Sequence, residues 1–123
     1  MYYGEFDSKA DIVREWNLGS FDGEVLYANY NQDSYDGHAV VLFVEGGKFY
    51  LVEDSHCSCY GLEDWSPEEM TVDMMRKIAE ADNNGYYSFR KEACQRALEV
   101  LDELNLIGAE DHVVAVAMRL KFA

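Results

Sequence analysis

One short run of the sequence carries the side chains that bind metals most readily: His56, Cys57 and Cys59 lie within four consecutive residues. Imidazole nitrogens and thiolates are the usual ligands of zinc. Structural zinc sites commonly combine two such pairs, and this chain has no second pair. The remaining soft ligands stand alone in the sequence: His38, Cys94 and His112. We therefore expect no cofactor, and the alternative hypothesis is a metal-binding module organised by His56, Cys57 and Cys59, with zinc as a possible metal.

The same thiols could act as nucleophiles only with a lowered pKa and a base held beside them. The surrounding segment is strongly acidic, and negative charge raises a thiol pKa. Adjacent carboxylates could instead serve as general acid and base, or hold a divalent cation. Three such pairs lie in the acidic stretch: Glu53-Asp54, Glu63-Asp64 and Glu68-Glu69. Their spacing is not that of a calcium loop, and solvated carboxylates explain them more simply, so we expect no catalytic residues and no enzymatic activity.

Acidic residues are concentrated in the middle of the chain. The formal net charge is −14 at pH 7, and residues 15–75 hold thirteen carboxylates against Lys48 as their only base. A charge of this sign opposes contact with nucleic-acid phosphates and with anionic lipid. It favours a basic protein partner, so we expect direct binding to neither nucleic acid nor membrane.

Tyrosines share this acidic stretch, and tyrosine is a residue type that anchors protein interfaces. Carboxylates and tyrosines could therefore form one partner-binding surface, although the tyrosines could equally be the framework of a sheet. The residues that we expect to contact a partner are Asp22, Glu24, Asp33, Tyr35, Asp36, Glu53, Asp54, Tyr60, Glu63 and Asp64.

The elements that would position these side chains begin with a short helix. Asp7 or Ser8 can cap it, and Asp11 completes a capping box with Ser8. Gly19 ends it. β-branched and aromatic residues then predict three strands with short connections, which indicates an antiparallel meander. These strands are residues 24–30, 38–45 and 48–54. The apolar run of residues 38–45 indicates that this strand is central in the sheet.

Residues 55–65 are expected to form a loop, and helices are expected after it. One helix begins either at Ser66-Pro67, which combine a serine cap with a proline at the first position, or afresh at Thr71. A second helix runs from Ser88 to about Asn105. Residues 111–122 are ambiguous between strand and helix, and helix is preferred.

Together these elements predict an α+β fold: a three-stranded antiparallel β-meander packed against three to four helices in one domain, residues 1–123. Residues 1–65 form its acidic helix-and-sheet region, and residues 66–123 form a nearly neutral helical region. Hydrophobic residues make up 49% of the chain, which argues against disorder. The odd number of cysteines, the absence of an apolar run of about 18 residues and the absence of a secretory leader lead us to expect a cytoplasmic protein.

One segment resembles a known group of proteins. The run Asp54-Ser-His-Cys-Ser-Cys-Tyr-Gly-Leu-Glu-Asp-Trp65, followed by Pro67-Glu-Glu69, resembles small uncharacterised proteins encoded by bacteriophages and prophages. The similarity extends to Tyr3-Gly-Glu-Phe-Asp-Ser8 and covers roughly residues 1–80. It carries no activity that could be transferred. It implies an accessory phage product that acts in the cytoplasm of a bacterial host.

The leading hypothesis is therefore an acidic binding protein that blocks a basic, nucleic-acid-binding surface of a host protein. An inhibitor of CRISPR or restriction nucleases is one such protein. The alternatives are the metal-binding module and a non-catalytic globular accessory protein. The latter could form a homodimer through an exposed strand edge or through the face that carries Met70, Met74 and Met75.

Overall fold

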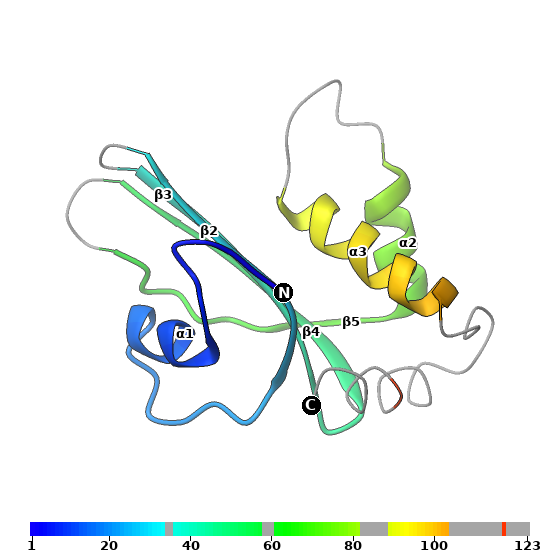
Figure 1. The fold of residues 1–123 in the computed structure, drawn as a ribbon, viewed down its shortest axis with the longest axis horizontal. Helices are drawn as coiled ribbons and strands as arrows, with labels where there is room; N and C mark the ends of the chain where they lie inside the picture. The colour runs from blue at the N-terminus through cyan, green and yellow to red at the C-terminus, as the bar shows by residue number, and fades with distance from the viewer. Residues whose placement is uncertain (34–35, 58–60, 82–88, 104–116, 118–123) are drawn as a thin grey trace.

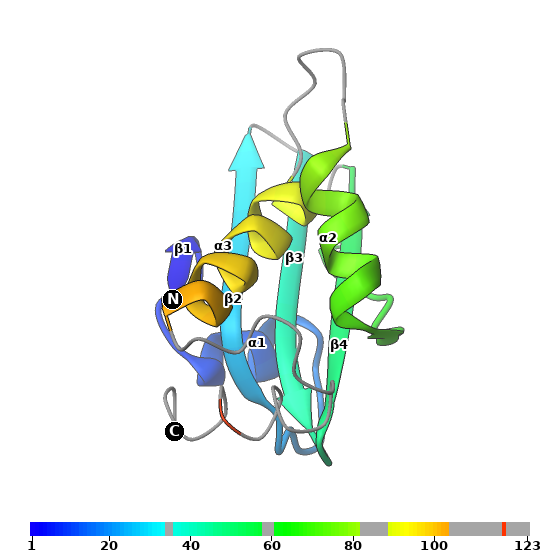
Figure 2. The ribbon, with the colours of Figure 1, turned by 90° about the vertical axis from the view of Figure 1, so that its right-hand side faces the viewer.

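The computed structural model describes residues 1–33, 36–57, 61–81, 89–103 and 117. In chain order, the elements are β1 (Tyr2–Gly4), α1 (Lys9–Glu15), β2 (Glu24–Asp33), β3 (Asp36–Glu45), β4 (Lys48–His56), β5 (Glu68–Met70), α2 (Val72–Glu80) and α3 (Phe89–Glu103). The five strands form one mixed sheet in the order β1-β2-β3-β4-β5. Figure 1 shows α1 on one side of this sheet and α2 with α3 on the other. Figure 2 shows α2 and α3 lying across β2, β3 and β4.

The predicted α+β class and the antiparallel meander are confirmed, with β3 at the centre, and the sheet is larger than predicted. β2, β3 and β4 pair antiparallel along nearly their whole lengths. Two three-residue strands extend the meander, β1 parallel to β2 and β5 antiparallel to β4. Such short strands carry too little periodicity to be recognised in a sequence. Pairing with a longer neighbour holds them extended.

The helix start predicted at Ser66-Pro67 is wrong, and the alternative start at Thr71 is confirmed. Residues 68–70 pair with residues 49–51 as β5, so the serine and the proline precede a strand. Thr71 caps α2, and its hydroxyl oxygen accepts a hydrogen bond from the Met74 N–H at 3.1 Å. Pairing with the edge of β4 thus outweighs a local capping signal.

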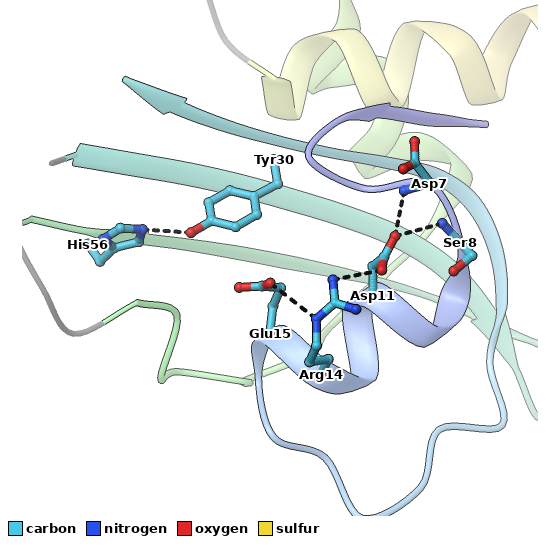
Figure 3. Close-up of polar contacts among 7 residues, drawn as sticks. All are labelled: Asp7, Ser8, Asp11, Arg14, Glu15, Tyr30 and His56. Carbon is cyan, nitrogen blue, oxygen red and sulfur yellow. Dashed lines mark hydrogen bonds and ion pairs between the residues drawn. The ribbon is translucent and has the colours of Figure 1, made fainter. Parts of the chain in front are cut away.

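The capping sequence at the start of α1 works through Asp11, as Figure 3 shows. The Asp11 carboxylate accepts hydrogen bonds from the backbone N–H groups of Asp7 at 2.8 Å and Ser8 at 3.2 Å. It also forms an ion pair with Arg14 at 2.7 Å. The bond from Asp7 is the main cause that lowers the pKa of Asp11. The first turn of the helix is therefore held by a charged acceptor.

A Schellman motif ends α1 earlier than predicted, before Gly19 is reached. Asn17 adopts the left-handed conformation with φ of 54°. The Leu18 N–H donates to the Val13 carbonyl at 2.9 Å, and the Asn17 N–H donates to the Arg14 carbonyl at 3.2 Å. Asparagine tolerates this conformation when glycine is not present. The chain then turns back along the sheet.

Both faces of the sheet are buried, so each long strand carries two sets of apolar residues. Along β3 the sets alternate. Val40, Leu42 and Val44 pack on the side of α2 and α3, whereas the side of α1 receives Ala39, Val41 and Phe43. In β2 a bulge interrupts the alternation, and two neighbours, Leu26 and Tyr27, both join the core on the side of α2 and α3. Burial on both faces explains the continuous apolar run of β3.

The helical layer closes one of these cores and removes one of the predicted dimer surfaces. Met70 is 2% exposed and Met75 is 0% exposed, and Met74 packs against the same cluster. The methionine face is therefore part of the core. The outermost strands, β1 and β5, are three residues each, which offers little backbone to a partner strand.

The helix predicted for residues 111–122 lies outside the described residues, apart from Ala117. The described part of the chain contains α1, α2 and α3, in line with the lower end of the predicted range of three to four helices. None of these helices is long and apolar enough to cross a membrane.

Candidate functional site: an acidic face with an aromatic groove

Asp54 fixes the geometry of the α1 side of the sheet. Its Oδ2 accepts hydrogen bonds from Trp16 Nε1 at 3.0 Å and from the backbone N–H groups of Glu63 at 3.1 Å and Asp64 at 3.0 Å. Its Oδ1 accepts a hydrogen bond from the Ser55 N–H at 2.8 Å. One carboxylate thereby ties α1, β4 and the loop before β5 together. Charge-assisted bonds of this kind are strong, so Asp54 acts as a structural clamp.

Aromatic rings pack together beside this clamp, with the buried ring of Phe43 at their centre. Trp65 stacks on Phe43 with ring centres 5.8 Å apart, and Tyr50 stacks on it at 5.4 Å. Phe21 meets Phe43 edge-on at 4.9 Å. Trp16 in turn contacts Trp65 edge-on at 5.0 Å. The clamp thus positions a ring cluster that is drawn from four separate segments.

A groove of about 320 Å³ opens beside these rings. Phe21, Tyr50 and Trp65 are half-buried there, whereas Phe43 is 2% exposed. Two exposed carboxylates, Asp22 and Glu45, complete the wall. No lysine or arginine is among the described residues that line the groove. We call it the aromatic groove.

Ten carboxylates lie on the side of α1, and two of them, Asp22 and Glu45, line this groove. Strand alternation places Glu45 on the face that carries Phe43, and cross-strand pairing places Glu69 opposite Tyr50. The first 22 residues and the loop before β5 add the remaining acids of this side. We call this side the acidic face, and its carboxylates are Glu5, Asp7, Asp11, Glu15, Asp22, Glu45, Asp54, Glu63, Asp64 and Glu69.

Three bases accompany these ten acids, and each has a partner within the protein. Lys9 Nζ lies 5.1 Å from the centre of the Phe21 ring. Arg14 contacts two acids of α1. Lys48 Nζ lies 3.6 Å from the Glu69 carboxylate. The acidic face therefore keeps a large excess of negative charge.

The two helices that cover the opposite side of the sheet, α2 and α3, are nearly neutral. These two helices carry six acids and five bases. Ion pairs link several of them: Asp73 with Lys77, Glu99 with Arg96, and Glu68 of β5 with Arg90. The two helices are therefore balanced in charge, and strand acids on the same side of the sheet, among them Asp36, Glu53 and Glu68, add negative charge beside them.

A half-buried histidine lies at the far end of the acidic face, next to α1. Tyr30 Oη and His56 Nε2 share a hydrogen bond of 2.7 Å, and His56 Nδ1 is buried without a partner. Figure 3 shows this pair with Glu15 on the neighbouring helix. Burial raises the pKa of Tyr30, and the charges of Glu15, Glu5 and Asp54 raise it further. The hydroxyl therefore stays protonated and can donate to the histidine.

The structure gives the predicted zinc ligands different surroundings. His56 Nε2 is occupied by Tyr30, and Cys57 is exposed. Cys59 lies outside the described residues. Within the described ranges, no three His, Cys, Asp or Glu side chains come together as metal ligands do.

Cys94 gives the folded protein a measurable sensitivity to alkaline pH. Burial raises the pKa of its thiol from 9.0 to about 11. The unfolded chain therefore loses this proton first, so the contribution of Cys94 to stability is complete below pH 9 and is lost as pH rises to about 11. Urea unfolding between these values should show a shallower alkaline decline for Cys94→Ala than for wild type. Cys57→Ala, at an exposed thiol, should keep the wild-type decline, and equal slopes in all three proteins would contradict the assignment.

The predicted partner-binding residues fall into separate places. The acidic face brings together four of them: Asp22, Asp54, Glu63 and Asp64. Glu53 points to the other side, where a hydrogen bond from His38 at 3.3 Å lowers its pKa.

The remaining predicted residues lie at the ends of strands or outside the described ranges. Glu24 begins β2, and its charge adds to the burial that raises the pKa of Tyr2. Asp33 and Asp36 pair at the end of the β2–β3 hairpin. Tyr35 and Tyr60 lie outside the described residues.

Sequence reasoning missed the aromatic groove and several acids of the acidic face. Phe43 and Tyr50 are interpreted as ordinary strand residues in a sequence, and their meeting with Phe21 and Trp65 depends on the fold. One local signal was available. The two aromatic residues of the groove that lie in loops each have an acidic neighbour in the sequence: Phe21 precedes Asp22, and Trp65 follows Asp64.

Comparison with protein-family models, curated proteins and solved structures gives no significant match for this chain. The site is therefore interpreted from its own geometry.

Proposed function

We propose that this protein binds a basic protein surface through its acidic face and occupies the place of the nucleic acid that such a surface holds. The observation that carries the proposal is the excess of carboxylates over bases on the α1 side of the sheet, where aromatic rings lie among them. Here ten acids and three paired bases lie on the α1 side, and α2 and α3 are nearly neutral.

Electrostatics favours this kind of partner. Duplex DNA presents about one negative charge per 1.7 Å of its axis, and proteins that bind it carry matching basic channels. A folded face that carries carboxylates can enter such a channel and release its bound counterions. Complementary charge also speeds the encounter and makes it dependent on salt. The resemblance of residues 1–80 to phage-encoded proteins supports a host defence nuclease as the partner, such as a CRISPR effector or a restriction enzyme.

The experiment measures displacement of a fluorescent DNA duplex from a panel of purified restriction endonucleases and CRISPR effector complexes. Wild-type protein should displace the duplex from at least one of them at low salt. Glu5→Gln, Asp7→Asn and Glu63→Gln together remove three exposed charges from the acidic face and leave the aromatic groove and the Asp54 clamp intact. This triple variant should act about tenfold more weakly.

A matched variant controls for net charge. Glu80→Gln, Asp102→Asn and Glu103→Gln remove three exposed charges from α2 and α3. This variant should displace DNA as wild type does. If no member of the panel releases DNA, or if the two triple variants lose the same activity, the proposal is wrong.

A further inference from the structure

We propose that the aromatic groove is a binding site for a guanidinium group, and that it takes an arginine side chain of the basic partner. This inference rests on the proposed function, because it names the chemical group that the acidic face would capture. Guanidinium is planar, stacks on aromatic faces and forms bidentate hydrogen bonds with carboxylates. The groove offers both kinds of contact in one place.

The rings of the groove have the orientation that a planar cation requires. The planes of Phe43 and Trp65 differ by 11°, and those of Phe43 and Tyr50 differ by 24°. The half-buried rings of Trp65 and Tyr50 therefore each lie within 24° of the plane of the buried Phe43 ring. A flat group stacked on one of them would lie roughly along the planes of the other two.

The charges at the groove complement a cation. Asp22 and Glu45 are exposed at its wall, and neither carboxylate has an ion pair among the described residues. Two bases lie close by: Lys9 contacts the Phe21 ring, and Lys48, the cross-strand neighbour of Glu45, contacts Glu69. Two negative charges beside aromatic rings would attract an external cation.

The protein already contains one contact of the proposed kind. Lys9 Nζ lies over the Phe21 ring at 5.1 Å from its centre. This ring belongs to the groove, so the cluster binds a cation within the chain. A second cation at Trp65 and Tyr50 would repeat the same chemistry with an external partner.

A second groove has carboxylates but lacks the aromatic rings that the proposed guanidinium site needs. It lies between α2 and α3, measures about 520 Å³ and also contains carboxylates, among them Glu80 and Asp102. No aromatic ring is among the described residues that line it, and Arg76 already stands in its wall. It therefore serves as a matched control within the same molecule.

The test titrates wild-type protein with N-acetyl-arginine methylamide and follows the Trp65 indole N–H by NMR. The neutral isostere N-acetyl-citrulline methylamide has almost the same shape without the charge. We expect the arginine probe to shift the Trp65 signal in a saturable way and the citrulline probe to leave it unchanged. The lysine analogue should bind more weakly than arginine, because its ammonium group does not stack.

Two double variants assign the binding to the groove. Asp22→Asn with Glu45→Gln should weaken binding of the arginine probe about tenfold. Glu80→Gln with Asp102→Asn should leave it unchanged. All four residues are exposed, so both variants should fold, and matching thermal midpoints verify this.

The inference is overturned if the arginine probe does not shift the NMR signal of the Trp65 indole N–H, or if the citrulline probe binds as well as the arginine probe. It is also overturned if the two double variants bind the arginine probe with the same affinity. Each of these results concerns the groove alone. The proposed function is tested by the triple variants, which leave the groove intact, so the two proposals can fail separately.

Discussion

Replacing Asp54 with alanine should lower the free energy of unfolding by about 3 kcal/mol, because four donors lose a charged acceptor. The Trp16 indole N–H and the backbone N–H groups of Ser55, Glu63 and Asp64 all depend on this one carboxylate. Without it, the loop before β5 loses its attachment to the sheet. Urea unfolding, followed by the fluorescence of Trp16 and Trp65, measures both the stability and the ring packing.

Two variants separate the parts of this effect. Asp54→Asn keeps the shape of the side chain and one oxygen acceptor, so it should lower the free energy of unfolding by less than Asp54→Ala does. Trp16→Phe removes a single donor and keeps an aromatic ring, so we expect a loss of about 1 kcal/mol from the hydrogen bond. If Asp54→Ala costs no more than a typical surface substitution, roughly 0.5 kcal/mol, the clamp does not hold this side of the protein together.

Gly4→Ala should destabilise the protein by about 3 kcal/mol through a backbone clash combined with an unfavourable conformation. Gly4 has φ of +65°, and an added Cβ would lie 2.1 Å from the carbonyl oxygen of Tyr30. That oxygen also accepts the Glu5 N–H at 2.8 Å, which joins β1 to β2. The methyl group would therefore push β1 away from the sheet edge.

Gly46→Ala is the matched control for this prediction. Gly46 has φ of +59°, almost the same as Gly4, and no atom lies within 4 Å of an added Cβ. Gly46→Ala should lower the free energy of unfolding by about 1 kcal/mol, because only the left-handed conformation is unfavourable there. The difference between the two alanine variants in urea unfolding isolates the clash. Equal losses would mean that β1 yields without strain and is not held against β2 as described.

Sequence patterns predict the fold where the signal is long and local. The three long strands span nine or ten residues and each contains an unbroken apolar run of at least four, and the Ser8 and Asp11 spacing predicts the start of α1. β1 and β5 could not be predicted, because three extended residues have no periodicity of their own. The start of α2 shows the limit of capping signals. Ser66-Pro67 is a good helix start by itself, but the chain gains more from pairing with β4.

The candidate site was less predictable than the fold, because it depends on which side of the sheet each acid faces. A one-residue difference along β4 places Glu53 beside His38 and Asp54 beside Trp16, on opposite sides. The sequence shows two adjacent carboxylates and no sign of this division. Nor does it show that Asp54 is used inside the molecule. The accumulation of acids between residues 15 and 75 was visible, and the side of the sheet on which each acid lies required the sheet register.

The salt dependence of partner binding tests the central claim most directly. The affinity for the responding nuclease is measured from about 50 to 200 mM salt for wild type and for the two triple variants. If the acidic face replaces nucleic acid, the logarithm of the affinity falls steeply with the logarithm of salt for wild type and for the variant of α2 and α3. The slope is shallower for the variant Glu5→Gln, Asp7→Asn, Glu63→Gln. An affinity that does not change with salt, or one slope shared by all three proteins, would contradict the claim.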